Sequence, residues 1–403
     1  MLFGGQLLNL KFPTTVIEEG KVAVLVPKIS ILFKDFETHA PSEAPVFYNP
    51  RMEFSRDVAV AALQAYQSIA GREITVCEPF TGCGIRGIRY AKEVDKAKSV
   101  TINDINTDAV KLARINVKKN LAESQVATIG NTDANTFLAL HFAPGKRFDV
   151  IDIDPFGSPA TYIESAIMAL RDGGLIALTA TDMAPLCGVH PQACLRKYGG
   201  KPLRTEYCHE LSVRILLNSL AMAAARHEMG IHVLFSHSTD HYIRVYAQVK
   251  HGAKQADSAI RRVGYALHCF SCFHHEVSFG ITSFLKKNCS ECGKHLAVAG
   301  PLWVGELASK EFCVQMRRKL QNKKLRTKKK LTMLLNTILG ELDAPPLYYV
   351  IDRICDRFNL RIPSTANITQ DLKKRDYKVA LTHFNLKGIK TDAPASVVRE
   401  VLS

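Results

Sequence analysis

Long hydrophobic runs are missing from this sequence of 403 residues. A helix that crosses a bilayer needs about 18 consecutive apolar residues, and no stretch approaches that length. The first residues also lack a positively charged segment followed by an apolar core and a cleavage site. We therefore expect a cytoplasmic protein that has no membrane partner and no obligate protein partner.

Acidic residues are scarce relative to basic ones. The 38 Asp and Glu face 53 Lys and Arg, which gives a formal net charge of +15. Such an excess suits a polyanionic partner, and nucleic acid is a simpler choice than an anionic membrane surface. Residues 310–403 alone hold 20 Lys and Arg but only 9 Asp and Glu. With 47% apolar and 23% charged residues, the chain has the composition of a folded globular protein.

The chain has no internal repeat, and from residue 74 to about 250 it alternates short β-rich runs with amphipathic helical segments. This order is typical of a parallel sheet that helices cover on both faces. We predict a doubly wound α/β sheet of about seven strands, preceded by a β hairpin at 14–27. The clearest strand segments are 74–77, 99–102, 148–153, 175–179, 233–236 and 242–249, of which the last alternates like an antiparallel strand.

A glycine-rich segment, Glu78-Pro79-Phe80-Thr81-Gly82-Cys83-Gly84, follows the first of these strands. Its glycines let the backbone approach a ligand closely, above the N-terminus of the next helix. Together with Gly87, the spacing also satisfies the dinucleotide fingerprint, so it does not separate NAD from S-adenosyl-L-methionine. Glu78 and Phe80 match the acid-x-aromatic-x-Gly-x-Gly pattern of class I methyltransferases. Glu78, Gly82 and Gly84 are therefore candidate cofactor-binding residues.

Acids at the next two strand ends favour the methyl donor. Asp104 is placed to accept both ribose hydroxyls, and Asp133 to accept from the adenine amino group. A turn or a helix N-cap is the structural alternative for each acid. Because the acids occur in order on successive strand ends, we predict S-adenosyl-L-methionine as the cofactor.

The apolar run 148–153 ends in Asp154-Pro155-Phe156-Gly157. Methyl transfer to an exocyclic amine needs groups that orient the nitrogen and stabilise the charge that it gains. Asp154 can accept one N–H bond and the Pro155 carbonyl the other, while Phe156 stacks on a base that has left its helix. A simple strand-ending turn is the alternative. Alignment with a sulfonium supplies much of the rate, so we expect no catalytic metal and no covalent enzyme intermediate.

Longer strings around these motifs resemble one family, the tRNA guanine-26 N2-dimethyltransferases, and its archaeal branch more than its eukaryotic branch. The resemblance covers most of residues 12–305. It implies a Rossmann-like class I methyltransferase that transfers one or two methyl groups to the N2 of guanine 26 in tRNA. The most specific strings are Phe47-Tyr48-Asn49-Pro50-Arg51-Met52, Gly84-Ile85-Arg86-Gly87-Ile88-Arg89, Asp152-Ile153-Asp154-Pro155-Phe156-Gly157-Ser158-Pro159 and Thr179-Ala180-Thr181-Asp182-Met183-Ala184-Pro185-Leu186-Cys187-Gly188.

The resemblance also implies roles for single residues. Asp154 resembles the catalytic acid of the family, and Phe47 and Phe156 resemble its base-stacking pair. Residues that resemble its donor contacts are Arg56, Arg86, Asp104, Asp133 and Ala134.

Cysteines follow a metal-binding pattern in one segment. The total of 11 is odd and does not suit a disulfide framework in a chain of this length. Cys269-x2-Cys272 and Cys289-x2-Cys292 are separated by 16 residues, which is close to the spacing of a zinc ribbon. We predict a structural Zn²⁺ held by these four thiolates, with free thiols or a redox pair as the alternative.

Nearby histidines, at 268, 274 and 275, could replace one of these ligands, and His237 and His241 have the spacing of metal ligands on a helix. We expect these histidines to be packed or solvated instead, because the last two lie in a loop between strands. We expect Cys187, Cys194 and Cys208 to be small buried residues. His209 and Glu210 are expected to form a local ion pair.

The C-terminal end combines helices with a short hairpin. Helical segments at 331–342, 347–358 and 369–375 precede two short strands within 379–392, which is a winged-helix-like order. The dense basic run 321–330 suits contact with phosphates, and a solvated helix face or a linker is the alternative.

Three domains are predicted from these features. Residues 1–252 form the methyltransferase domain with its N-terminal hairpin, residues 253–309 a zinc-binding segment, and residues 310–403 a smaller, basic α+β domain that binds tRNA.

Three other functions stay open. The amine pocket by itself also suits an amino-methyltransferase that acts on another RNA or DNA base. An NAD-dependent oxidoreductase lacks an evident hydride-partner residue beside Asp154. A non-catalytic RNA-binding protein would not need the intact Asp154-Pro155-Phe156.

Overall fold

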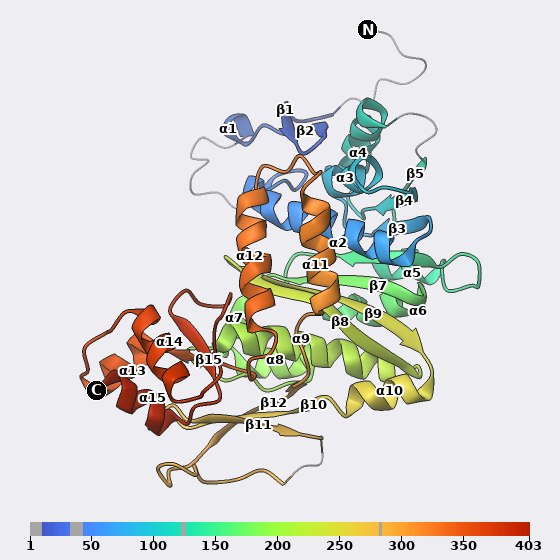
Figure 1. The fold of residues 1–403 in the computed structure, drawn as a ribbon. Helices are drawn as coiled ribbons and strands as arrows, with labels where there is room; N and C mark the ends of the chain where they lie inside the picture. The colour runs from blue at the N-terminus through green and yellow to red at the C-terminus, as the bar shows by residue number, and fades with distance from the viewer. Residues whose placement is uncertain (1–9, 33–42, 122–125, 282–283) are drawn as a thin grey trace. The chain divides into compact units, whose positions relative to one another are not determined.

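The computed structural model of the chain describes residues 10–32, 43–121, 126–281 and 284–403 (Figure 1). The chain divides into two compact units, each built from segments that are separate in the sequence. The first unit comprises Met1–Asp154, Ser165–Ile176 and Gln315–Thr332, and the second comprises Pro155–Glu164, Ala177–Val314 and Met333–Ser403. The three predicted domains, 1–252, 253–309 and 310–403, stay a prediction.

The central sheet has the predicted seven strands. They are β3 (Ile74–Glu78), β4 (Ala97–Asn103), β5 (Val126–Gly130), β6 (Phe148–Ile153), β7 (Leu170–Ala180), β8 (Met229–Thr239) and β9 (Tyr242–His251). Their order is β5-β4-β3-β6-β7-β9-β8. β3 pairs in parallel with β4 and β6, and β4 pairs in parallel with β5, whereas β8 and β9 are antiparallel. The α/β class and the antiparallel direction of the last strand are both confirmed.

Helices of the first unit follow its strands. They are α2 (Glu53–Ala70), α3 (Ile85–Glu93), α4 (Thr107–Asn120) and α5 (Ala134–Ala139), with the short η2 (Pro50–Met52) before them. All six residues of β6 are buried, as expected for a central strand that is covered on both faces. α3 packs against β3, β4, α2 and α4. The carboxyl ends of β3, β4 and β6 therefore carry the loops that hold the predicted site residues.

The predicted N-terminal hairpin is formed by β1 (Thr14–Glu19) and β2 (Val22–Pro27), followed by α1 (Ile29–Leu32). Asparagine side chains of α4 bind the backbone of β2. Asn120 Oδ1 accepts from the Ala23 N–H at 2.9 Å, and Asn116 Oδ1 accepts from the Leu25 N–H at 2.7 Å. These contacts satisfy edge-strand groups that would otherwise need another strand or water.

The second unit surrounds a long buried helix. Its elements before the C-terminal end are η3 (Ala160–Tyr162), α7 (Met183–Leu186), α8 (Pro191–Tyr198), α9 (Cys208–Ala225), α10 (Ala253–Ile260), β10 (Val263–His268), β11 (His275–Phe279) and β12 (Ala297–Trp303). α9 packs against β8, β9, α10 and β12. The strands β11-β10-β12 form a separate antiparallel sheet, which lies within the predicted zinc-binding segment 253–309.

The C-terminal segment contains the predicted helices and hairpin. Its elements are β13 (Tyr349–Val350), α13 (Ile351–Phe358), α14 (Thr365–Lys374), β14 (Val379–Leu381), β15 (Gly388–Thr391) and α15 (Ala395–Leu402). The small sheet has the order β13-β15-β14. β13 and α15 are additions to the predicted elements. Among the described residues, no helix is long and apolar enough to cross a membrane.

Three of the boundaries between the two units fall inside helices. These helices are α6 (Ile163–Met168), α11 (Lys310–Leu320) and α12 (Lys328–Glu341). The basic run 321–330 forms the linker after α11 and the first residues of α12, and some of its side chains contact other residues of the first unit. Lys323 Nζ donates to Gln64 Oε1 at 2.7 Å, and Arg326 Nη2 donates to the Glu18 carbonyl at 3.0 Å. Lys330 lies over the Phe54 ring. A purely solvated face is therefore wrong for this run.

Candidate functional site

Two glycines shape the loop between β3 and α3. Gly82 and Gly84 have φ angles of 52° and 85°, a left-handed conformation that other residues adopt rarely. The Gly82 N–H donates to Asp104 Oδ2 at 2.8 Å. A Cβ at Gly82 would lie only 3.1 Å from the Phe47 carbonyl oxygen. The loop therefore brings three predicted site residues, Phe47, Gly82 and Asp104, close together.

Glu78 ends β3 and is 2% exposed. Its Oε2 accepts from the Gly87 N–H at 2.9 Å and from the Thr81 hydroxyl at 2.8 Å. Burial raises the pKa of Glu78 to about 8, although the Arg86 guanidinium opposes this shift. A Cβ at Gly87 would overlap Ile102 and would lie 2.8 Å from Glu78 Oε2. Glycine at 87 thus permits α3 to pack closely against β3 and β4.

Asp104 and Asp133 lie at successive strand ends, as predicted. Asp104 Oδ1 accepts from the Asn106 N–H at 2.9 Å, and Asp133 Oδ1 accepts from the Thr136 N–H at 3.0 Å. Asp133 is thereby the N-cap of α5, whose first residue is the buried Ala134. The turn and the cap that were alternatives for these acids are both present. They do not exclude a ligand, because each carboxylate oxygen can accept more than one hydrogen bond.

Two asparagines hold these strand ends together, and the sequence did not single them out. Asn103 Nδ2 donates to the Thr132 carbonyl at 2.8 Å, and Asn131 Nδ2 donates to the Asp104 carbonyl at 2.8 Å. Asn103 is fully buried. An amide one or two residues before an acid at a strand end is the sequence feature that both share.

Asp154 follows β6 and forms an ion pair with Arg86. The Arg86 side chain is 5% exposed, and its guanidinium also lies 3.6 Å from Asp152 Oδ2 and 3.6 Å from Glu78 Oε1. Asp152 in turn accepts from the Tyr90 hydroxyl. Burial works against the charge of Arg86, but Asp154 and the other carboxylates outweigh it and raise its pKa well above the usual range. Arg86 thus connects the glycine-rich loop with the tetrapeptide that begins at Asp154.

The residues predicted to contact a base differ in exposure. Phe156 is 65% exposed, which is unusual for a large aromatic side chain, whereas Pro155 is buried and Phe47 is half-buried. Gly157 has a φ angle of 77°, and its N–H donates to Thr181 Oγ1 at 2.8 Å. The loop after β6 therefore has a defined conformation that presents an aromatic face to solvent.

Arg56 has strong partners within the first unit. It is 4% exposed and donates to Glu19 from Nε at 2.7 Å and from Nη2 at 2.6 Å. It also donates to the Asn49 carbonyl at 3.3 Å and lies over the Tyr48 ring. These contacts join α2 to β1 and to the segment after Phe47. The role of Arg56 in donor binding stays a prediction.

The four predicted zinc ligands come together in the second unit. Cys269 Sγ lies 3.4 Å from Cys292 Sγ, and Cys272 Sγ lies 3.6 Å from Cys289 Sγ. A tetrahedral ion with Zn–S bonds of about 2.3 Å requires S–S edges of about 3.8 Å. All four sulfurs lie within 4.8 Å of one another. Their arrangement therefore fits one tetrahedral metal ion.

Known proteins similar to this chain identify its family. A family model described as N2,N2-dimethylguanosine tRNA methyltransferase matches residues 20–403. The chain belongs to this family.

Relatives match it over nearly their whole length. A tRNA (guanine(26)-N(2))-dimethyltransferase of Methanothermobacter thermautotrophicus is 42% identical over 96% of this chain and 98% of that protein. The enzyme of the same name from Pyrococcus abyssi is 35% identical over 96% of this chain and 97% of its own. The structure of Trm1 from Pyrococcus horikoshii, a complex with S-adenosyl-L-methionine, is 34% identical, with a TM-score of 0.84, and covers 96% of this chain and all of that one.

Family membership resolves the ambiguity of the Gly82-x-Gly84-x-x-Gly87 spacing in favour of a methyltransferase. The alternative of an NAD-dependent oxidoreductase depended on this glycine spacing, which now belongs to a methyltransferase. The chain is an S-adenosyl-L-methionine-dependent methyltransferase by family, as its sequence predicted.

One group of side chains that could hold a metal ion was not predicted. Cys187, Cys208 and His209 bring their ligand atoms within 4.8 Å of one another. Hydrogen bonds from Cys208, and then from His209, lower the pKa of Cys187 to about 5 in spite of its burial. Glu210 pairs with Arg214 at 2.7 Å and with Lys390 at 2.9 Å, so the expected ion pair between His209 and Glu210 is wrong.

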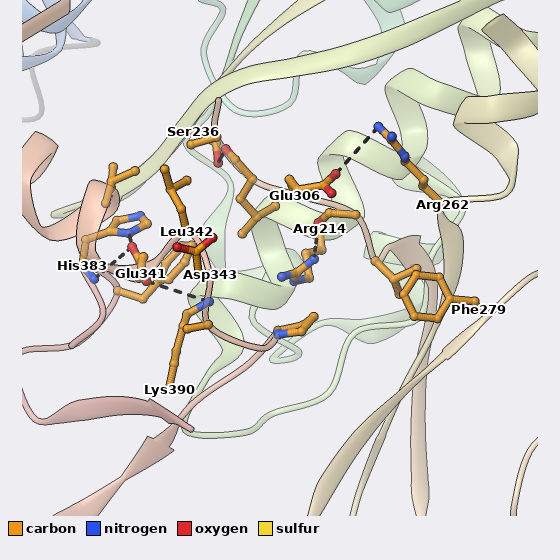
Figure 2. Close-up of a pocket in the computed structure, with 18 residues that line it drawn as sticks. Arg214, Ser236, Arg262, Phe279, Glu306, Glu341, Leu342, Asp343, His383 and Lys390 are labelled. Atoms are coloured by element: carbon orange, nitrogen blue, oxygen red, sulfur yellow. Dashed lines mark hydrogen bonds and ion pairs between the residues drawn. The ribbon is translucent and has the colours of Figure 1, made fainter. Parts of the chain in front are cut away.

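A cavity of about 320 Å³ lies elsewhere in the second unit, and Figure 2 shows its lining. Glu341 pairs with His383, and Lys390 Nζ lies 3.8 Å from Glu341 Oε2. On the other side of the cavity, Arg262 lies 3.7 Å from Glu306. The charges of the cavity thus compensate one another. Among the described residues, its lining includes none of the predicted site residues.

Proposed function

We propose that this chain transfers methyl groups from S-adenosyl-L-methionine to the exocyclic N2 of guanine 26 in tRNA. The products are N2-methylguanosine and then N2,N2-dimethylguanosine. The observation that carries the proposal is the match to the dimethyltransferases over 96% of the chain, with the predicted motifs intact at the ends of β3 and β6. An amino-methyltransferase for another RNA or DNA base is the second candidate, because an amine pocket alone does not select guanine.

Asp154 is proposed as the catalytic acid. Its carboxylate would accept one N–H bond of the guanine amine, and the Pro155 carbonyl would accept the other. The amine gains positive charge as the methyl group arrives, so a fixed carboxylate stabilises the transition state more than the ground state. Arg86 holds Asp154 through their ion pair and would keep it oriented before the base arrives.

Phe47 and Phe156 are proposed to hold the flipped base. Base stacking on an aromatic ring contributes about 1–3 kcal/mol per base. Phe156 is 65% exposed, so it can gain a stacking partner without first leaving the core. The backbone of Phe47 lies close to Gly82, so this residue is placed beside the donor loop.

The donor would lie on the glycine-rich loop. When bound, S-adenosyl-L-methionine supplies a methyl group on a sulfonium that is already a good leaving group. Glu78 would face the cationic amino-acid portion, and Asp104 would accept from the ribose hydroxyls, with Gly82 and Gly84 allowing close approach. Adenine would lie near Asp133 and Ala134. Arg56 and Arg86 are the proposed basic contacts.

The remaining parts are proposed to support substrate binding. A structural Zn²⁺ on Cys269, Cys272, Cys289 and Cys292 would hold two chain turns together without an open position. The basic C-terminal residues 310–403 would contact the tRNA backbone, which gives affinity without base specificity. Lys323 and Arg326 already donate hydrogen bonds to Gln64 and to the Glu18 carbonyl. The exposed Lys324 and Lys329 are therefore better candidates for phosphate contacts.

The decisive experiment incubates the purified chain with labelled S-adenosyl-L-methionine and an unmodified tRNA transcript, followed by digestion to nucleosides. We expect mono- and dimethylguanosine from the natural chain and at least about a 100-fold loss of rate for Asp154→Asn, which keeps the shape but removes the charge. Donor binding, measured by calorimetry, should persist in this variant. Asp257→Asn, on the exposed face of α10, is the matched control and should retain full activity.

Substrate variants separate the two candidate functions. A tRNA with adenosine at position 26 should accept no methyl group. Methylation of that transcript, or of a DNA or ribosomal RNA fragment at a similar rate, would favour the second candidate. Unchanged transfer by Asp154→Asn would reject the proposed mechanism.

A further inference from the structure

The group Cys187, Cys208 and His209 is a separate cluster of soft ligands in the second unit. Its ligand atoms lie within 4.8 Å of one another, and all three residues are half-buried, so an ion from solvent can reach them. From the convergence of these three side chains, we propose a second metal site, which takes Zn²⁺ or another thiophilic divalent ion. Within the described residues, no fourth Cys, His, Asp or Glu joins this group, and water would complete the coordination.

The size of the cluster fits a single ion. Zn–S bonds of about 2.3 Å and Zn–N bonds of about 2.0–2.1 Å give tetrahedral S–S edges of about 3.8 Å and S–N edges of about 3.6 Å. All ligand separations in the cluster are at most 4.8 Å. Two thiolates and a neutral imidazole cancel the charge of a divalent ion, so the loaded site adds no net charge to a half-buried place. Binding requires both cysteines as thiolates.

The backbone is built to bring the two cysteine segments together. Cys187 is the C-cap of α7, and Cys208 and His209 open α9. Gly188, next to Cys187, has a φ angle of 86°, and a Cβ there would lie 2.8 Å from the Arg204 nitrogen and 2.9 Å from the Leu203 carbonyl carbon. Only glycine permits this approach of the segment after Cys187 to the segment before Cys208. The positive end of the α9 dipole also favours thiolates at its first turn.

The surroundings of His209 supply a second argument. Its ring lies close to Cys187 and to the backbone of Phe384. Metal-binding histidines commonly donate their other N–H to a carbonyl or carboxylate, which fixes the tautomer and aims the free nitrogen at the ion. Phe384 lies in the loop between β14 and β15. An ion at this site would therefore connect α7, α9 and the C-terminal segment.

The test counts metal ions in purified, reduced chain by mass spectrometry of the elements. Cys187→Ser, Cys208→Ser and His209→Gln should each hold one ion fewer than the natural chain. Cys194→Ser is the matched control. Cys194 is close to Cys187 in the sequence and is buried, but it does not belong to the group, so this variant should keep the full metal count. The test compares the number of metal ions per chain between each variant and the natural chain, so its result does not depend on whether the four-cysteine site holds an ion.

A measurement on the natural chain removes any dependence on folding of the variants. After exchange with cadmium, metal NMR should show a resonance typical of two sulfur ligands with nitrogen, in addition to any resonance of a four-sulfur site. The proposal is overturned if that resonance is missing and the ligand variants keep the full metal count. It is also overturned if the chain, purified without oxygen, carries a Cys187–Cys208 disulfide.

Discussion

Replacing Arg86 with Met is expected to destabilise the first unit by about 3 kcal/mol at neutral pH. The side chain is 5% exposed and is the cation among Asp154, Asp152 and Glu78. Removing one partner of a buried ion pair costs about 3–5 kcal/mol, because the remaining charge stays without compensation. The lower end applies here, since the Asp154 side chain is 17% exposed and can recover some hydration.

Urea unfolding followed by circular dichroism measures this loss, and the thermal midpoint should fall by roughly 6–12 °C. Asp154→Asn in the same chain should restore part of the stability, since it removes one of the three carboxylates.

Arg72→Met is the matched control for this experiment. The Arg72 side chain is 49% exposed, and its partner Asp149 keeps Arg171 at 3.1 Å and the Thr75 N–H at 2.8 Å. The expected loss is below about 1 kcal/mol. Equal losses in the two variants would show that the charge cluster does not carry the stability of this region.

Three further outcomes are expected. The affinity for S-adenosyl-L-methionine should rise nearly tenfold per pH unit on the acidic side of the Glu78 pKa of about 8, since the cationic donor favours the ionised carboxylate; calorimetry should find this slope absent in Glu78→Gln. Gly87→Ala should lower the free energy of unfolding in urea by about 1–3 kcal/mol, because the new Cβ overlaps Ile102. Gly340→Ala is the control and should not destabilise, because no atom lies within 4 Å of its new Cβ; equal effects would contradict the packing argument. Cys292→Ser should release one ion and lower the stability of the second unit by more than about 4 kcal/mol, and an unchanged metal count would exclude the four-cysteine site.

Much of the fold was predictable because its local signals agree. Alternating β-rich and helical segments predicted the seven-stranded sheet, and turn residues predicted the β1–β2 hairpin. β7 extends from Leu170, five residues before the predicted start, because charged residues and glycines at its beginning hide an extended segment. β13, with two residues, pairs with β15 and is too short to carry a periodic signal.

The candidate site could be predicted only where its residues lie in short motifs. Glu78, Asp104 and Asp154 were predicted as site residues because parallel strands place their carboxyl ends at one edge of a sheet, and their roles stay a prediction. The ion pair between Arg86 and Asp154 joins residues 68 positions apart, and no local pattern contains it. The same holds for Arg56 and Glu19, which are 37 positions apart.

The sequence by itself determined the class of fold, the glycine-rich methyltransferase motif and the four-cysteine segment, and it predicted the tetrapeptide that begins at Asp154 as an amine pocket, because each depends on residues close together in the chain. Tertiary structure alone decided which charges compensate one another. It paired Glu210 with Lys390 instead of His209, and it left His209 beside Cys187 and Cys208. The physical reason is that buried charges and metal ligands choose partners by distance in space, which folding sets through contacts between segments far apart in the sequence.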